Sequence, residues 1–358
     1  MSAIDVVLCN PVRTPIGTYA GSLKSTSATE LGATVIRETL KRSGLAAEKI
    51  ETLVMGQVIQ AGSKMNPSRQ AGIQAGLPVE VPALTVNRVC GSGAQGIVSA
   101  AQEVWAGFLK CAIAGGMENM DMAPYLLPQG RWGARMGDVP LIDSMLLDGL
   151  NDAFSGQHSG WHTEDLASKY GISRADQDAW ALRSQLSFSA AQAAGKFAAE
   201  IVPVDIKGRK GPELFGNDEH NRPETTADSL AKLKPAFRKD GTITAGNAPG
   251  LNSGAAVMIV AERGFAEANG LQPMARLVAY GVAAVEPVLF GIGPVPAVRQ
   301  ALARAGWQVS DVDRAEINEA FAAIAIACTR ELGLAPEVVN VEGGPSPMVI
   351  PSALREPC

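Results

Sequence analysis

A single cysteine precedes a glycine-rich turn in the segment "VNRVCGSGAQGIVSAAQEV", residues 86–104. The apolar pattern predicts a strand that ends before Cys90 and an amphipathic helix that begins after it. The positive end of a helix dipole stabilises a thiolate. Gly91 and Gly93 leave space for a bulky acyl substrate, and the amide of Cys90 is available to an oxyanion. The segment therefore fits a nucleophile elbow, although a free cysteine is more commonly a small buried residue.

A second interpretation of the same segment is a dinucleotide-binding turn. Gly91, Gly93 and Gly96 match G-x-G-x-x-G after a strand and before a helix. This interpretation requires an acidic residue at the end of the next strand, where "KCAIAGGMEN" offers only Glu118 beyond two glycines. It also leaves Cys90 without a task. Both interpretations stay open on these residues alone.

Six segments in order give the chain a resemblance to the thiolases, enzymes that make or cleave 3-ketoacyl-CoA. The resemblance covers essentially the whole chain and implies that Cys90 is the nucleophile that carries the acyl thioester. The implied reaction condenses two acetyl-CoA to acetoacetyl-CoA, with thiolysis as the reverse. The segments are "RTPIG" (13–17), "VNRVCGSG" (86–93), "GGMENM" (115–120), "TAGNAPGLNSGAA" (244–256), "GIGPVPA" (291–297) and "NEAFA" (318–322).

Further site residues follow from the resemblance, each with a simpler alternative. Asn318 opens a predicted helix and is suited to an N-cap, whereas the resemblance implies that it holds the water of an oxyanion hole. Phe321 is either a core residue or part of the acyl and pantetheine pocket. His158 is either a surface loop residue or lies beside the pantetheine tunnel. The family usually has "HMG" at this position, so Ser159 and Trp161 are departures.

The nucleotide end of CoA has its own candidates. By the resemblance, Arg222 and Ser229 contact the nucleotide and pantetheine, although a solvated loop charge and a helix-capping serine are the simpler interpretations. Pro249 replaces a serine that commonly bonds pantetheine, and proline has neither hydroxyl nor amide proton. We expect CoA to be held less tightly unless Ala245 and its neighbouring backbone groups compensate. His162 and His220 match nothing catalytic, and we expect them to be exposed.

Thiolase chemistry also needs a base for the thiol and a second base for the α-proton. The family supplies a histidine from a "GHP" block and a second cysteine, but after "NVEGG" this chain reads "PSPMVIPSALREPC". For suitable codons, one restored base turns that tail into "PIAHGHPIGATGAV". We therefore expect a one-base deletion near Gly344 and a truncated C-terminal half. Cys358 lacks the right context to be the second cysteine.

Alternating strand and helix patterns before Met120 and after residue 250 predict an α/β protein, with a mainly helical insertion between them. With the resemblance, this predicts the thiolase fold, in which two similar α/β halves are layered and carry an inserted mainly helical loop domain. The C-terminal half is expected to be incomplete. The expected parts are an N-terminal half at 1–120 and 247–268, a loop domain at 121–246, and a C-terminal half at 269–358.

Composition limits the partners and the compartment. The chain has 358 residues, 46% of them hydrophobic, and a net charge of -5, which argues against nucleic-acid binding. Five cysteines without CxxC indicate neither a disulfide framework nor a zinc site, and no apolar run is long enough to span a membrane. We expect a cytoplasmic protein. The resemblance implies acyl-CoA as substrate, no metal or redox cofactor, and a homo-oligomer, commonly a tetramer of paired dimers.

Three alternatives to the acetyl-CoA reaction remain at this point. The first is a 3-ketoacyl-CoA thiolase that acts on longer chains in fatty-acid breakdown. The second is a non-catalytic acyl-CoA-binding protein, because the histidine and second-cysteine blocks are not found. The third is a nicotinamide-dependent enzyme, on the glycine pattern alone.

Overall fold

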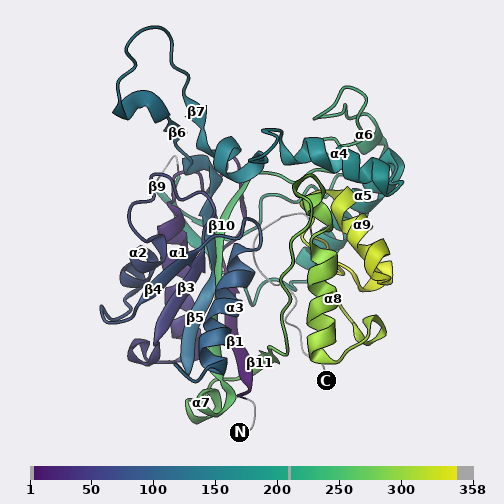
Figure 1. Ribbon diagram of the computed structural model, residues 1–358. Helices are drawn as coiled ribbons and strands as arrows, with labels where there is room; N and C mark the ends of the chain where they lie inside the picture. The colour runs from purple at the N-terminus through teal and green to yellow at the C-terminus, as the bar shows by residue number, and fades with distance from the viewer. Residues whose placement is uncertain (1–3, 209–210, 345–358) are drawn as a thin grey trace.

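The computed structural model describes residues 4–208 and 211–344 of the chain. Its main sheet has seven strands in the described residues, ordered β11-β1-β10-β5-β3-β4, with β2 paired to β10. Helices pack on both faces of this sheet (Figure 1). The strands are β1 (Val6–Arg13), β2 (Gly17–Thr18), β3 (Thr52–Gly56), β4 (Ala83–Val86), β5 (Cys111–Asn119), β10 (Asn252–Glu262) and β11 (Pro273–Arg276).

Strands β3, β4 and β5 are parallel, so their carboxyl ends meet at one edge of the sheet. Helix α2 (Pro67–Ala75) connects β3 to β4, and helix α3 (Ser92–Trp105) connects β4 to β5. β10 runs antiparallel to β5 and begins at the same edge, where Ser253 lies opposite Asn119. The segments after β4 and β5 and the segment before β10 therefore converge at this carboxyl edge.

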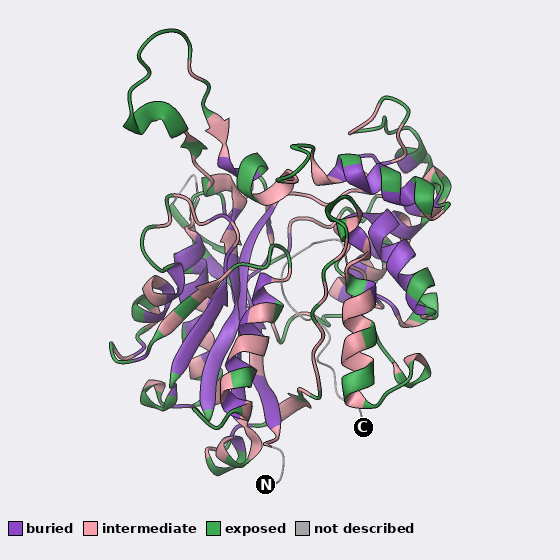
Figure 2. Cartoon of the chain, viewed as in Figure 1, coloured by how far each residue is buried: buried purple, intermediate pink, exposed green. Residues whose placement is uncertain are grey.

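The two faces of the sheet are covered by different helices. Val7 and Cys9 of β1 pack in the cluster that includes helix α1 (Ala28–Ser43), while Val6 and Leu8 pack with α3. This alternation follows from the two-residue period of a strand. The central strands are buried along most of their length (Figure 2). Helix α1 ends at Gly44 with φ of 67°, as its sequence predicts.

Glycines allow α3 to lie close to the sheet and β10 to lie close to its neighbour β5. A Cβ on Gly115 of β5 would overlap the carbonyl oxygen of Ala256. A Cβ on Gly96 of α3 would lie 2.9 Å from the carbonyl oxygen of Gly115. A Cβ on Gly56 would collide with Ser92 at the start of α3. The contacts of Gly56 and Gly96 fix the position of α3, and hence of Cys90, which precedes the N-cap residue of that helix.

The middle of the chain forms a protruding arm and a group of helices. The arm extends from β6 (Tyr125–Leu126) and β7 (Ile142–Asp143) away from the body of the molecule (Figure 1). Ser173 caps the first turn of α5 in a capping box with Asp176, as expected. The other elements are α4 (Ser159–Lys169), α5 (Arg174–Ala193), α6 (Ala227–Ala231), β8 (Val204–Gly208) and β9 (Gly211–Phe215).

The C-terminal part is built from α7 (Arg263–Ala268), α8 (Pro294–Ala305) and α9 (Ala322–Leu332). Strand β11 joins the main sheet through β1. Among the described residues, the segments that contain Ala315 and Val339 share a single parallel bridge and form no named strand. Helix α9 is buried on nearly every side and packs with α4 and α5. None of the helices in residues 4–208 and 211–344 is long and apolar enough to cross a membrane.

The close approach at Gly115 leads to a stability prediction. Gly115→Ala should lower the free energy of unfolding by about 3 kcal/mol, because the methyl group meets backbone that cannot move aside. Gly264→Ala is the matched control, since its Cβ would meet nothing closer than 3.9 Å; we expect it to change stability by less than about 1 kcal/mol. Urea unfolding measures both variants. Equal stabilities would contradict the packing described here.

Candidate active site

Cys90 lies at the carboxyl edge, between the end of β4 and the N-cap of α3, and it has exposed surface. The turn around it is held by short backbone bonds. Gly91 N–H donates to the carbonyl of Arg88 at 3.1 Å, and Ser92 N–H donates to that of Val89 at 3.0 Å. The Ser92 hydroxyl accepts from Arg88 N–H at 2.8 Å and donates to the Val89 carbonyl at 2.6 Å. The strand, turn and helix expected around Cys90 are thus present.

The residue before Cys90 has a strained backbone. Val89 has φ of 48°, in the left-handed region that β-branched residues rarely adopt. Such a conformation costs of order 1–3 kcal/mol and persists only where neighbouring contacts impose it. The hydrogen bonds of Ser92 are among those contacts. Strain of this kind is frequent at functional sites.

The thiol of Cys90 is not activated by its surroundings. Desolvation raises its pKa, although the residue has exposed surface, and the hydrogen bond from its own backbone amide only partly opposes this. The sequence pattern predicted a thiolate at the start of α3, whereas desolvation shifts the pKa of Cys90 in the opposite direction. A thiol with a raised pKa is protonated at neutral pH, so reaction at Cys90 requires a base.

The other described cysteines form part of the core, as expected. Cys9, Cys111 and Cys328 are fully buried. Burial raises the pKa of Cys9 to about 11 and the pKa values of Cys111 and Cys328 to about 12. Their thiolates are therefore not accessible at neutral pH.

His158 is the N-cap of α4. Its Nδ1 accepts a hydrogen bond from the backbone N–H of Gly160 at 3.0 Å, so the proton of the neutral ring is on Nε2. Desolvation lowers the pKa of His158, which keeps the ring neutral at pH 7. The ring stacks on Phe237 at a centroid distance of 4.7 Å. His158 thus presents an N–H donor on a ring of fixed orientation.

Phe237 connects His158 to Phe321. The rings of Phe237 and Phe321 meet edge to face, with centroids 5.9 Å apart. Phe321 is buried and is the N-cap residue of α9, and Ala322 N–H donates to the carbonyl of Asn247 at 3.0 Å. The structure therefore brings together His158, Phe321 and the loop before β10. Sequence reasoning missed Phe237, whose only signal is an aromatic residue in the polar segment "KPAFRKDG".

Asn318 does not open a helix, so the expected N-cap is wrong. Helix α9 begins only at Ala322, because Phe321 still has extended backbone. Asn318 is exposed, and its side chain makes no hydrogen bond within the part of the chain that the structure describes. Its carboxamide is therefore available to a water molecule or a ligand.

The neighbour of Asn318 holds this loop in place. The carboxylate of Glu319 accepts hydrogen bonds from Trp180 Nε1 at 2.9 Å, Ser184 Oγ at 2.7 Å and Asn340 Nδ2 at 2.7 Å. Burial nevertheless raises the pKa of Glu319. Sequence reasoning missed this residue, although an acidic side chain in the apolar segment "INEAFAAIAIA" is itself a signal.

Of the residues proposed to contact CoA, Ala245 belongs to the loop before β10, whereas Arg222 precedes α6 and Ser229 lies within it. Arg222 is exposed, and its backbone N–H donates to Gln185 Oε1. Ser229 forms a capping box with Thr226 at the start of α6, so its hydroxyl is already engaged by the backbone. Ala245 is exposed in the turn before β10. Within the described ranges, no hydrogen bond joins these three residues to Cys90 or His158.

Two histidines expected to be exposed are not. His162 is buried, with its Nε2 2.7 Å from Ser155 Oγ. His220 is half-buried and packs against Gly250, where a Cβ would overlap its ring. Burial and the charge of Arg222 lower the pKa of His220. Both predictions were wrong because the contacts that bury His162 and His220 form only in the folded chain and leave no local pattern in the sequence.

Glu118 does not provide the free acid that dinucleotide binding requires. Its Oε2 accepts hydrogen bonds from the backbone N–H groups of Val58 at 2.8 Å and Ile59 at 3.3 Å. This carboxylate therefore serves the turn after β3 rather than a ribose hydroxyl. The structure gives the nicotinamide-dependent interpretation no support.

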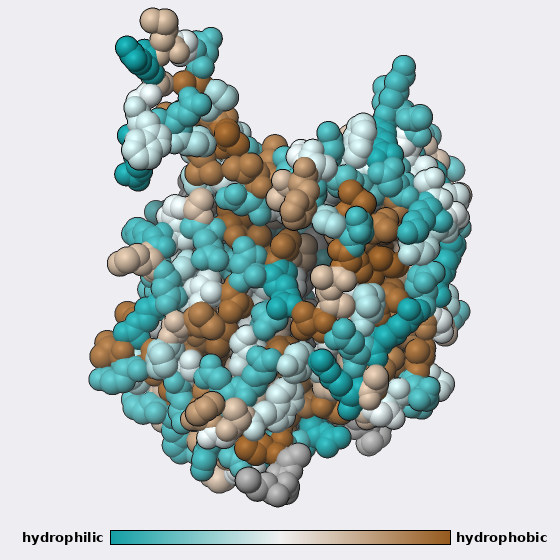
Figure 3. Space-filling view, in the orientation of Figure 1, coloured by the Kyte–Doolittle hydropathy of each residue, from teal (hydrophilic) through white to brown (hydrophobic). Residues whose placement is uncertain are grey.

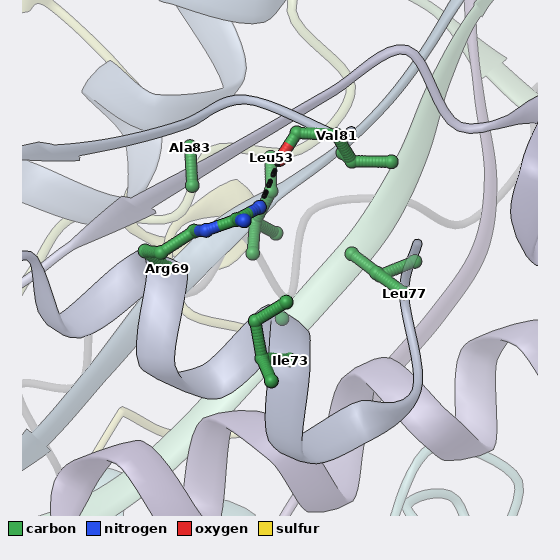
Figure 4. A pocket seen from close by; sticks show the side chains of 7 residues that line it. Leu53, Arg69, Ile73, Leu77, Val81 and Ala83 are labelled. Carbon is green, nitrogen blue, oxygen red and sulfur yellow. Dashed lines mark hydrogen bonds between the residues drawn. The ribbon is translucent and has the colours of Figure 1, made fainter. Parts of the chain in front are cut away.

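A small pocket between α2 and the sheet is distinct from this site (Figure 4). It is lined by apolar side chains, and the guanidinium of Arg69 donates to the carbonyl of Val81 at 2.7 Å. Leu53 and Ala83 belong to the amino-terminal ends of β3 and β4. Cys90 follows the opposite end of β4, so this pocket is not where Cys90 reacts.

The groups at the carboxyl edge and in the adjoining loops suit acyl-transfer chemistry. A thiol at a strand–helix turn is a nucleophile once a base removes its proton. The imidazole N–H of His158 and the unbonded carboxamide of Asn318 are donors of the type that stabilise an oxyanion.

Comparison with known proteins agrees with this chemistry. The model of the thiolase N-terminal domain matches residues 6–264, and that of the thiolase C-terminal domain matches residues 271–351. The C-terminal match does not support the expected truncation, and the tail that suggested a frameshift, residues 345–358, lies outside the described residues.

Relatives and a solved structure extend the match over nearly all of the chain. An acetyl-CoA acetyltransferase of Pseudomonas aeruginosa is 50% identical over 95% of this chain and 87% of its own length. The β-ketothiolase BktB of Cupriavidus necator is 52% identical over 95% and 86%. The crystal structure of the Bacillus anthracis acetyl-CoA acetyltransferase is 42% identical, with a TM-score of 0.94 over 97% of this chain and 89% of that one. The expected fold is thereby confirmed, and the chain belongs to the thiolase family.

Proposed function

We propose that this chain transfers acyl groups between coenzyme A thioesters through a thioester on Cys90. Its main reaction is the condensation of two acetyl-CoA to acetoacetyl-CoA, with thiolysis as the reverse. The observation that carries the proposal is the exposed Cys90 at the mouth of α3, inside a family-matched region whose relatives are named for this activity.

The first step forms the acyl-enzyme. The Cys90 sulfur attacks the carbonyl carbon of acetyl-CoA, an S–C bond forms, and the S–C bond to CoA breaks. The thiol proton leaves through a base and returns to the departing CoA thiolate. Because desolvation raises the pKa of Cys90, this proton transfer is required at neutral pH. Donors such as the Asn318 carboxamide, directly or through a water, stabilise the oxyanion.

The second step forms the carbon–carbon bond. A base removes an α-proton from a second acetyl-CoA, and the resulting carbanion attacks the acetyl carbonyl on Cys90. The bond to sulfur breaks, acetoacetyl-CoA leaves, and the thiolate regains a proton. Neither step changes an oxidation state in a way that needs a redox group, so the proposal includes no metal or redox cofactor.

We infer that the acyl group and the pantetheine arm bind beside the aromatic cluster. His158, Phe237 and Phe321 form a contiguous surface of rings next to the loop that contains Ala245. Backbone groups of that loop take the place of the serine that Pro249 replaces. Arg222, which is exposed, provides positive charge for the CoA phosphates, whereas the Ser229 hydroxyl is engaged in its capping box.

A second candidate is the same chemistry on longer 3-ketoacyl-CoA. The β-ketothiolase relative, at 52% identity, favours keeping it. Turnover of acetoacetyl-CoA compared with a long 3-ketoacyl-CoA separates the two.

The proposed assembly is a homo-oligomer of the tetramer type. The arm after β6 exposes large apolar side chains, and apolar residues gather on it and at its base (Figure 3). At the other side of the sheet, β4 is an edge strand with Leu84 48% exposed. Exposed apolar patches and open edges of this kind mark interfaces. The exposed arm residues include Tyr125, Leu127, Trp132, Met136 and Leu141.

The proposed compartment is the cytoplasm. Cys9, Cys90, Cys111 and Cys328 are all free thiols in the described residues. Free thiols persist in reducing compartments, and the relatives named above are bacterial acetyltransferases and a β-ketothiolase.

The proposal predicts a covalent adduct at Cys90. Incubation with acetyl-CoA should add one acetyl group to the Cys90 peptide, and Cys90→Ala should abolish both the adduct and turnover. Cys9, Cys111 and Cys328 are internal controls, because they are fully buried whereas Cys90 is exposed. Mass spectrometry of peptides measures the adduct. Binding of acetyl-CoA without an adduct would instead identify a non-catalytic acyl-CoA-binding protein.

The two tasks of His158 can be separated by substitution. His158→Ala should lose about 1 kcal/mol of stability with the α4 cap, whereas His158→Asn keeps a capping oxygen for Gly160 N–H. Both variants should transfer acyl groups at least about tenfold more slowly, since both lose the Nε2–H donor. Thermal unfolding and steady-state kinetics measure the two effects. Normal turnover in the folded asparagine variant would exclude His158 from the site.

The proposed role of the arm predicts that substitutions in it change the oligomeric state. Trp132 and Met136 are 85% and 95% exposed, so replacing both with serine removes apolar surface that the single chain does not use. We expect a tetramer to become a smaller species in sedimentation velocity. Phe108→Ser, at a residue 83% exposed outside the arm, is the control and should keep the assembly unchanged. A tetramer that survives the double substitution would contradict the role of the arm.

A further inference from the structure

A buried carboxylate lies at the end of β5, beside the strands that lead to Cys90. Glu118 Oε2 accepts the N–H groups of Val58 and Ile59 at 2.8 and 3.3 Å. Its Oε1 is buried without a hydrogen-bond partner in residues 4–208 and 211–344. The cost of burying this group raises the pKa of Glu118 to about 7. A carboxylate placed at such a cost, in a strand of the sheet, indicates a specific task.

The turn that Glu118 holds is bonded to the end of β4. Gln57 N–H donates to the carbonyl of Val86 at 3.1 Å. The carbonyl of Val58 accepts from the side chain of Asn87, Nδ2, at 3.3 Å. The peptide group that joins Val58 and Ile59 is thus contacted by Glu118 at its N–H and by Asn87 at its carbonyl.

Asn87 also bonds to Val89, the residue with the strained backbone. Its Oδ1 accepts the N–H of Val89 at 2.9 Å. Val89 has φ of 48° and directly precedes Cys90. Strained backbone requires contacts that exclude its relaxed alternatives, and this bond acts on the strained residue itself.

We propose that Glu118 is a positioning residue, which holds the Cys90 turn in its strained form through Val58, Asn87 and Val89. The proposal rests on the proposed function only in that Cys90 is the residue that reacts. Glu118 itself touches neither Cys90 nor the acyl group. Its contribution is to keep the thiol at the mouth of α3, in the desolvated position that raises its pKa.

Release of the turn should change the reactivity of Cys90 in the opposite direction to loss of a catalytic group. A released turn lets the Cys90 sulfur leave its desolvated position for the solvent that already reaches the exposed part of the residue, so the pKa of Cys90 falls toward its ordinary value. Each pKa unit is a factor of ten in thiolate at neutral pH. Glu118→Ala should therefore make Cys90 react faster with a small alkylating reagent, while acyl transfer from acetyl-CoA becomes slower.

The test is the rate of Cys90 carboxamidomethylation by iodoacetamide between pH 6 and 10, followed by peptide mass spectrometry. Glu118→Ala should raise the rate at pH 7 by about tenfold, which corresponds to a fall of one unit in the apparent thiol pKa. Glu118→Gln keeps an oxygen that accepts Val58 N–H, and we expect its rate to stay within about twofold of the unmodified chain.

Glu51 provides a matched control. Its carboxylate also accepts two backbone N–H groups, those of Lys110 at 2.6 Å and Cys111 at 3.0 Å, but at the opposite end of β5. Glu51→Ala should leave Cys90 alkylation unchanged. Asn87→Ala, at an exposed residue, tests the last link in the event that Glu118→Ala does not fold, and it should produce the same acceleration.

The outcomes separate this inference from the proposed function. Alkylation within twofold of the unmodified chain, or slower, in folded Glu118→Ala or in Asn87→Ala would overturn the positioning role. Equal acceleration by Glu51→Ala would overturn it too, because the effect would then be general loosening of the sheet. Failure of the unmodified chain to accept acetyl, together with the expected alkylation changes, would remove the acyl-transfer proposal and leave the positioning role intact.

Discussion

The site depends on the close contact between helix α3 and the parallel strands beneath it. Gly56 and Gly96 lie where a side chain would push α3 away from the sheet, and Gly115 lies where one would push β5 and β10 apart. With these residues, the first turn of α3 lies directly on the carboxyl end of β3. Cys90 then has no freedom to move away from the edge where the other loops converge. Packing of small residues, rather than any charged contact, therefore sets where the nucleophile is.

The same close packing explains why Cys90 is poised but not activated. Surrounding protein desolvates the thiol and raises its pKa, which is opposite to the effect of the positive end of a helix. A protonated, ordered thiol is protected from adventitious reaction until a base and a substrate are both present. The cost is that the turn must be held in an unfavourable backbone conformation at Val89. Specific bonds to Ser92 and Asn87 meet that cost locally.

Local patterns in the sequence predicted the elements well, and they failed where folding joins distant segments. The strand before Cys90, the helix after it and the glycine end of α1 follow from spacing alone. The burial of His162 depends on Ser155 at a turn of irregular structure, which no periodicity reveals. The start of α9 was placed too early at Asn318, because the extended backbone of Phe321 comes from its packing and not from its residue type.

The residues of the site that were missed have a common character. Phe237 and Glu319 act on neighbours far away in the chain, Phe237 by joining two rings and Glu319 by accepting bonds from α5 and Asn340. The expected loop domain at residues 121–246 remains a prediction. Where such an inserted domain begins and ends depends on contacts between residues that are far apart in the sequence.

The loop before β10 and the loop before α9 must behave as one unit. Asn247 is the link: its carbonyl accepts Ala322 N–H, while its side chain bonds to Asp178 of α5 and to the carbonyl of Thr242. A ligand that contacts Ala245 therefore presses on a segment already tied to Phe321. Because Phe321 packs on Phe237 and Phe237 on His158, the rings cannot shift independently of that loop. The ring cluster of His158, Phe237 and Phe321 is thus tied to helices α4, α5 and α9, whereas Cys90 is positioned by the sheet and α3. The proposed acyl transfer therefore requires the packing between these two parts to hold them together.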